Sequence, residues 1–226
     1  MSVGSTIISI GTLSRNRLWG EAAAARTAHA TTTLVRDGER AILVDPSLPA
    51  QALAARFNER TGEGLADVTD VFCTTLRPVH RRALEAFPKA RWWTHETELE
   101  MYRSHLMSLA DSAERLDEEA TAAVEADLKL LDRFRAAPDK LGEQTHLFPL
   151  PGASVGSAGL LLTPPAKTLV VAGDAAVTAE HVLRGQVWEG CADAEAALKS
   201  LQDMLEIADA IIPGHDNLMF APRNWL

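Results

Sequence analysis

The chain has 226 residues, of which 46% are hydrophobic and 23% charged, and its formal net charge is −9. This composition fits one globular domain spanning residues 1–226. The acidic balance, without a dense run of Lys or Arg, argues against nucleic acid as the main partner. No apolar run is long enough to span a bilayer and no secretory signal is visible, so we expect a cytoplasmic protein that does not bind membranes. Cys73 and Cys191 lie far apart and are expected to be reduced thiols.

The first half of the chain alternates short apolar runs with helical patterns. Its predicted elements, in chain order, are an edge strand at 6–10, a loop or short helix at 11–30, strands at 31–35 and 41–44, a helix at 49–60, a strand at 68–73, a short helix at 79–87 and a strand at 90–94. Asp37-Gly38 favours a tight hairpin turn between the second and third strands, because glycine tolerates the positive φ that such turns need.

The second half begins with a long helical pattern and returns to strands. Apolar side chains recur at helical spacing from residue 96 to about 134, which predicts two helices with a break near residues 111–120. The later elements are strands at 146–150, 159–163 and 168–172, a helix at 193–208 and a strand at 210–212. Strands at both ends of the sequence with helices between them indicate an α/β sandwich.

Three apolar runs end in turns that carry a polar side chain. Val71-Phe72-Cys73 leads through a loop broken at Pro78 to His80, and the other two runs end at Gly173-Asp174 and Pro213-Gly214-His215. Side chains at such strand ends can converge on one place. Two imidazoles and one carboxylate are a common ligand set for a divalent metal, so His80, Asp174 and His215 are the candidate metal ligands.

The order of these pieces resembles the metallo-β-lactamase fold superfamily from about residue 30 to the end of the chain. The matching segments are Leu43-Val44-Asp45-Pro46, the run into His80, Phe87-Pro88-Lys89-Ala90, Pro151-Gly152-Ala153-Ser154, Gly173-Asp174 and Pro213-Gly214-His215. The resemblance implies an αββα sandwich of the α/β class. It also implies a site for two metal ions, usually zinc, at the edge of the two sheets.

The resemblance further implies that this metal site is incomplete. Four of the family's seven ligand positions carry residues that differ from the family's ligands, namely Thr75, Arg77, Val79 and Ala153. The family's first metal keeps only the shared Asp174, because its three histidines are replaced. The second metal keeps His80, Asp174 and His215, a set that can hold one zinc, iron or manganese ion or, in a decayed site, none. A full two-metal site is excluded.

Arg77 and Thr75 are the candidate residues for ligand binding. Arg77 is a permanent cation that would either neutralise Asp174 in place of the first metal or clamp a carboxylate or phosphate, unless it is a plain surface arginine. Thr75 and Ser154 could offer hydroxyl groups to a pocket or simply form turns. Asp216 is a candidate to orient a ligand histidine.

Two functions are compatible with these residues. The first is a mononuclear metal-dependent hydrolase of a small ester, lactone or thioester, as the resemblance implies, with metal-bound water as the nucleophile. The second is a catalytically silent, metal-free family member whose cleft binds an anionic small molecule through Arg77. A third role, as a dimer partner through the long middle helices, would give an oligomer.

Overall fold

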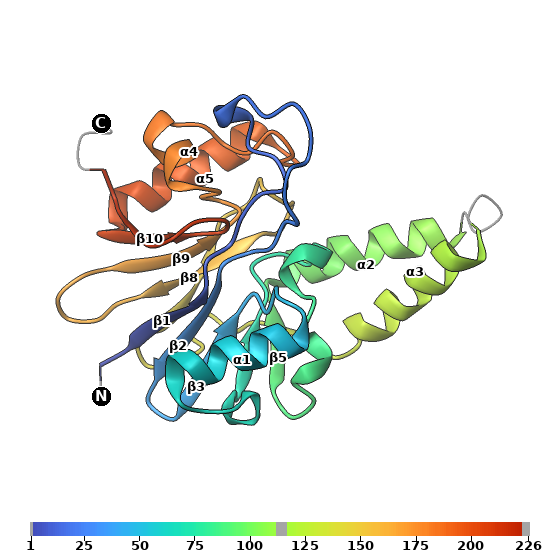
Figure 1. The fold of residues 1–226 in the computed structure, drawn as a ribbon, viewed down its shortest axis with the longest axis horizontal. Coiled ribbons are helices and arrows are strands. Elements are labelled where there is room, and N and C mark those ends of the chain that lie inside the picture. Colours follow the sequence, from blue (N-terminus) through green and yellow to red (C-terminus); the bar gives the residue numbers. More distant parts are fainter. Residues whose placement is uncertain (1, 112–116, 223–226) are drawn as a thin grey trace.

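The computed structural model describes residues 2–111 and 117–222 (Figure 1). Two β-sheets lie face to face, one with the strand order β1-β2-β3-β4-β5-β6 and the other with the order β11-β10-β9-β8-β7. In Figure 1, α1 lies over the outer side of the first sheet and α4 and α5 over that of the second, while α2 and α3 form a projecting hairpin. The predicted αββα sandwich is therefore confirmed.

Each sheet is built from consecutive strands of the chain. The strands of the first sheet are β1 (Gly4–Ser9), β2 (Thr32–Asp37), β3 (Arg40–Val44), β4 (Asp70–Phe72), β5 (Arg91–Thr94) and β6 (Phe134–Ala136). The strands of the second sheet are β7 (Thr145–Pro149), β8 (Ala158–Leu162), β9 (Leu169–Gly173), β10 (Ala210–Pro213) and β11 (Met219–Phe220).

The α-helices are α1 (Ala50–Thr61), α2 (Glu96–Asp111), α3 (Glu118–Leu131), α4 (Ala179–Arg184) and α5 (Ala194–Ile207). Short 3-10 helices cover Arg17–Trp19, Leu65–Asp67, Pro78–His80 and Leu84–Ala86. Within the described ranges, no helix combines the length and apolarity that crossing a membrane requires.

The layers arise because the central strands bury both faces. In β3, Ile42 and Val44 pack into the cluster between the two sheets, whereas Leu43 points to the other side and packs with Leu53 and Phe57 of α1. Successive side chains of a strand point to opposite faces, so an unbroken apolar run is what a strand buried on both sides needs.

The prediction of a single helix at 79–87 is wrong. The chain there forms two 3-10 turns, in which the His80 N–H donates to the Arg77 carbonyl and the Phe87 N–H to the Leu84 carbonyl. The Ala83 N–H donates outside the segment, to the Pro46 carbonyl at 2.9 Å. A loop elsewhere in the chain therefore takes a donor that a continuous helix would need.

Phe134 was expected on the helical stripe but belongs to β6, where it pairs with Trp92 and the two rings lie 5.6 Å apart. Helix α4 and strand β11 were not predicted. The expected break between the middle helices agrees with α2 ending at Asp111 and α3 beginning at Glu118, although residues 112–116 lie outside the described part. Cys73 and Cys191 are both free, as predicted.

Candidate metal centre

His80, Asp174 and His215 come together at one edge of the sandwich. One ligand atom from each of the three lies within 4.8 Å of the others, and the residues are only 0%, 6% and 7% exposed. The His80 Nε2 atom is 3.2 Å from Asp174 Oδ2, and the His215 Nε2 atom is 3.2 Å from Asp174 Oδ1. The carboxylate thus lies between two imidazoles, in a buried place.

Two glycines allow the strand ends to approach this closely. Strands β9 and β10 are parallel neighbours, and Pro213 pairs with Gly173. A Cβ atom on Gly214 would lie 2.7 Å from the Gly173 carbonyl carbon and 2.9 Å from Asp174 Oδ1. Gly173 has a φ of 54°, and a Cβ atom there would lie 2.3 Å from Thr74 Oγ1. Larger residues would push the candidate ligands apart.

Asp45 fixes the orientation of the His80 ring. The His80 Nδ1 atom is 3.0 Å from Asp45 Oδ2, and Asp45 also accepts hydrogen bonds from the Thr74 N–H and hydroxyl at 2.9 and 2.7 Å. An ionised carboxylate only accepts hydrogen bonds, so we place a proton on Nδ1. This arrangement turns Nε2 toward Asp174, which is how a second partner commonly orients a ligand histidine.

The ring of His215 is held by the loop at residues 11–30. Its Nδ1 atom lies 2.9 Å from the His29 carbonyl oxygen and 3.2 Å from that of Thr12. Carbonyls only accept, so Nδ1 carries the proton and Nε2 faces the site. Asp216, which the sequence suggested for orienting a ligand histidine, accepts instead from the Ala179 N–H at the start of α4.

The electrostatics of the trio favour a charged His80 when no metal is bound. Burial lowers its pKa, but the carboxylates of Asp174 and Asp45 outweigh burial and raise it from 6.5 to about 10. Burial likewise opposes ionisation of Asp174, yet His80 and His215 hold the pKa of that carboxyl well below its usual range. Without a metal, the site therefore holds a buried imidazolium between two carboxylates.

The donor set nevertheless fits a divalent ion. The buried His80 Nε2 and Asp174 Oδ1 atoms have no hydrogen-bond partner, although an Asp174 oxygen lies 3.2 Å from the first and the His215 Nε2 atom lies 3.2 Å from the second. These contacts are close but poorly aligned for hydrogen bonds. The separation is near the ~3.3 Å between two ligands of a tetrahedral zinc with bonds of about 2.0 Å.

Arg77 occupies the other side of Asp174. Its Nη1 donates to Asp174 Oδ2 at 3.2 Å, and its Nη2 donates to the carbonyls of Ala153 and, at 3.0 Å, Gly190. The Trp188 ring covers the guanidinium, with Cζ 4.5 Å from the ring centre. Both terminal nitrogens of Arg77 are thus bound within the protein, and the side chain is not a free surface arginine.

Thr75 and Ser154 point to a buried carboxylate that the sequence analysis missed. The Thr75 hydroxyl donates to Glu98 Oε1 and the Ser154 hydroxyl to Glu98 Oε2, each at 2.7 Å. Glu98 lies in the first turn of α2 and is only 4% exposed. Its neighbours Glu96 and Glu100 are exposed, so the sequence around Glu98 carries no signal that one glutamate of the three is buried.

A family model for the metallo-beta-lactamase superfamily matches residues 26–215. The chain belongs to this superfamily. The match includes every residue of the trio, Arg77 and Glu98, so the resemblance seen in the sequence is confirmed. Comparison with curated protein sequences gives no match.

Solved structures of other superfamily members share the fold at low sequence identity. A candidate metallo-beta-lactamase from Thermotoga maritima superposes with a TM-score of 0.70 at 16% identity, over 97% of this chain and 100% of its own. AiiA from B. thuringiensis, with N-decanoyl-L-homoserine bound, gives 0.64 at 18% identity over 96% and 94%. The dizinc quorum-quenching lactonase AidC gives 0.62 at 17% over 79% and 68%. At these identities the likeness establishes the fold.

Sequence reasoning missed further residues around this superfamily site. Asp45 directly follows β3, as Asp174 directly follows β9 in the other sheet, and this shared pattern was a usable signal. Trp188 and Gly190 lie in the loop between α4 and α5, where nothing in the sequence marks a contact with Arg77. Their roles depend on how a distant loop folds over the strand ends.

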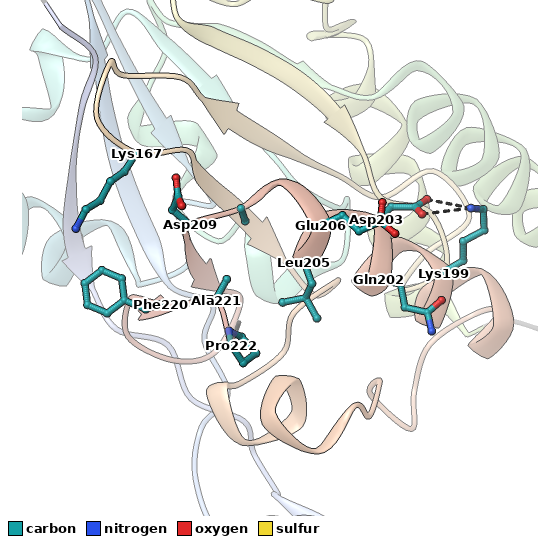
Figure 2. A pocket seen from close by; sticks show the side chains of 11 residues that line it. Lys167, Lys199, Gln202, Asp203, Leu205, Glu206, Asp209, Phe220, Ala221 and Pro222 are labelled. Atoms are coloured by element: carbon teal, nitrogen blue, oxygen red, sulfur yellow. Dashed lines mark hydrogen bonds and ion pairs between the residues drawn. The ribbon is translucent and has the colours of Figure 1, made fainter. Parts of the chain in front are cut away.

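A cavity of about 1070 Å³ lies away from these residues, along α5 and β11 (Figure 2). Lys167 and Phe220 line one end of it, and Lys199 and Asp203 form an ion pair at the other. None of the candidate ligands takes part in its lining. The size of this cavity therefore does not identify the functional site.

Proposed function

We propose that this superfamily member is a mononuclear metal-dependent hydrolase of a small ester, lactone or thioester, with its ion held by His80, Asp174 and His215. The observation that carries the proposal is the pair of buried, unpartnered atoms, His80 Nε2 and Asp174 Oδ1. Unpartnered polar atoms are costly in a protein interior, and a cation between the two imidazoles and the carboxylate would satisfy both atoms.

Each surrounding residue has a task in this mechanism. A divalent ion in the site would lower the pKa of a bound water and polarise the substrate carbonyl. Asp45 and the carbonyls of Thr12 and His29 keep the Nδ1 protons in place, so that Nε2 of His80 and of His215 is available as a ligand. Arg77 binds Asp174 Oδ2 and adds a fixed positive charge, which favours negative charge developing on a substrate oxygen.

The substrate class and the metal are supported by the relatives. Structures of AiiA and of another acyl homoserine lactone hydrolase carry N-decanoyl- or N-hexanoyl-L-homoserine at the active site, and AidC is described as a dizinc enzyme. Zinc is accordingly the first candidate ion for this chain, with iron and manganese next. Small hydrolysable esters, lactones and thioesters are the substrates to screen first.

A metal-free binding protein is the second candidate, because one observation favours it. The raised pKa of His80 gives the site an imidazolium, which together with Arg77 balances the charges of Asp45 and Asp174 without an ion. An anionic ligand would then have to compete with Asp174 and two backbone carbonyls for the guanidinium of Arg77. This competition weakens Arg77 as a ligand clamp.

Metal content measured by elemental mass spectrometry separates the two candidates. On protein purified without an affinity tag or chelator, we expect close to one equivalent of zinc, iron or manganese. The His80→Ala and His215→Ala variants should lose it, whereas His105→Ala, at an exposed position on α2, should keep it. Protein that takes up no ion after soaking in zinc and in manganese would overturn the hydrolase proposal and leave the metal-free candidate.

A further inference from the structure

We propose that Glu98 is a positioning residue that, together with Arg77, replaces the family's first metal ion as the cross-link between two loops. The loops are residues 73–80 after β4 and residues 150–157 between β7 and β8. The proposal itself rests on the contacts of Glu98, and only its second readout rests on the proposed metal site.

Each carboxylate oxygen of Glu98 holds one of the two loops. Oε1 accepts from the Thr75 hydroxyl at 2.7 Å and from the Leu76 N–H at 2.8 Å. Oε2 accepts from the Ser154 hydroxyl at 2.7 Å and from the Gly156 N–H at 3.2 Å. A single buried side chain thus ties both loops to the first turn of α2, and to each other through α2.

The second loop packs directly on the backbone of α2. A Cβ atom on Gly156 would lie 2.1 Å from the Glu98 nitrogen and 2.5 Å from the Thr97 carbonyl carbon. No side chain fits between this loop and the helix, so glycine is needed for the approach. The close packing brings the Gly156 N–H within reach of the carboxylate.

The contacts of Glu98 are those of a carboxylate bound without a cation. Among the described residues, no Lys, Arg or His nitrogen lies within ion-pair distance of it, although the residue is only 4% exposed. Burying a charge is costly unless several donors compensate, and here four donors do so. A side chain serving only to begin a helix would have no need of two remote loops.

Arg77 extends the same cross-link toward Asp174. It follows Leu76 in the chain, and its Nη2 donates to the carbonyl of Ala153, the neighbour of Ser154. Positions 75, 77 and 153 are those at which the resemblance places the histidines of the first metal. In this chain two side chains join the loops there. The Arg77 guanidinium donates hydrogen bonds, the Glu98 carboxylate accepts them, and no ion is required.

The test compares Glu98→Gln with Glu100→Gln, since Glu100 lies on the same helix and is exposed. In Glu98→Gln an amide N–H₂ replaces the oxygen that holds one loop, so both donors of that loop lose their partner and the side chain no longer restrains the two loops against each other. Amide hydrogen exchange of the metal-free protein should become about tenfold faster in both loops. Exchange in α5 should stay unchanged, and Glu100→Gln should match the wild type throughout. Faster exchange in α2 with both loops unchanged would overturn the cross-link.

A second readout is the affinity for cobalt(II), followed by its absorption spectrum. Glu98 lies outside the trio, so a purely local role in α2 would leave the affinity of the folded protein unchanged. We expect Glu98→Gln to weaken cobalt binding about tenfold, because His80 is carried by a loosened loop. Unchanged affinity would contradict the positioning role. If the wild type binds no cobalt, the proposed function fails, while hydrogen exchange still decides the role of Glu98.

Two milder variants keep the test decisive if Glu98→Gln does not fold. Thr75→Val and Ser154→Ala each remove one hydroxyl donor, on opposite loops. The two hydroxyls share the Glu98 carboxylate and also lie 3.2 Å from each other, so the two substitutions should be non-additive in their effect on exchange. Strictly additive effects would show two independent loops and overturn the proposal.

Discussion

The two sides of Asp174 keep its charge balanced by different means. On the retained side, His80 Nε2 and Asp174 Oδ1 lack a hydrogen-bond partner, and the His215 Nε2 atom lies 3.2 Å from the same carboxylate. On the replaced side, Arg77 is fully bound, to Asp174, to two carbonyls and to the face of Trp188. In our proposal the retained side would receive a cation, whereas the replaced side already contains one. The comparison suggests how loops can stay in place although four of the seven ligand positions of the family are replaced.

Removing the shared charge should have the largest effect, because both sides depend on it. Asp174→Asn leaves the buried His80 imidazolium and the half-buried Arg77 without their common partner, and we expect it to cost about 3–5 kcal/mol of unfolding free energy. It should also abolish metal binding. Urea unfolding of the metal-free protein measures the first effect. Asp132→Asn, whose side chain is 70% exposed, should change stability by no more than about 0.5 kcal/mol. If Asp174→Asn were as stable as the wild type, the claim that both sides depend on the Asp174 charge would be refuted.

Arg77→Met should move stability and metal affinity in opposite directions. Three acceptors lose their donor, so the metal-free protein should lose about 1–3 kcal/mol. Zinc affinity should rise on the order of tenfold, because a positive charge next to the ion is gone. Chemical unfolding and a chelator competition assay measure the two changes. Arg56→Met, at an exposed pair with Glu59, is the control. A fall in zinc affinity would mean that Arg77 supports the retained side directly.

The titration of His80 should make the retained side sensitive to pH. Its pKa is raised from 6.5 to about 10 in the fold, so the stabilisation is complete below pH 6.5 and is lost as the pH rises toward 10. A metal must displace this proton, so zinc affinity should increase with pH over the same range. Asp45→Asn removes one of the two charges behind the shift and should flatten both profiles. A flat profile in the wild type would contradict the buried imidazolium.

Asp216→Asn should have the smallest effect. Its side chain accepts from the N–H groups of Ala179 and Asn217, and an amide oxygen can still accept from Ala179. The His215 ring is held by two backbone carbonyls instead. We expect a stability change of about 0.5 kcal/mol or less and unchanged zinc affinity. Zinc titration followed by calorimetry checks this. A marked loss of affinity would restore Asp216 as an orienting residue for the metal site.

The fold was largely predictable because the central strands are apolar on both faces. Runs such as Ile42-Leu43-Val44 fit few alternatives, and the hairpin turn at Gly38 carries its own signal. Phe134 was misplaced because helical spacing continued by chance into a three-residue strand. Strand β6 is fixed by pairing with β5, which is a tertiary contact that local pattern does not encode.

Whether a site residue could be predicted also depends on whether its position follows from local sequence or from contacts with distant segments. His80, Asp174 and His215 could be found because each follows an apolar strand that ends in a turn. Glu98 could not, since its burial depends on two loops that lie more than twenty residues before it and more than fifty after it. The partners of His215 are backbone carbonyls, which every residue type has, so the sequence carries no signal for these contacts.

The loop at residues 11–30 holds His215 across almost the full length of the chain. The His29 carbonyl accepts from the imidazole, and the neighbouring Thr31 N–H donates to the Gly214 carbonyl at 2.6 Å. These partners are 186 residues apart in the sequence, so the ribosome makes His29 long before it makes His215. The first sheet has all its strands by residue 136 and can begin to fold while the chain is still growing. The contact between His215 and the loop at residues 11–30 can form only after residue 215 has been made, when the strands of the first sheet are already complete.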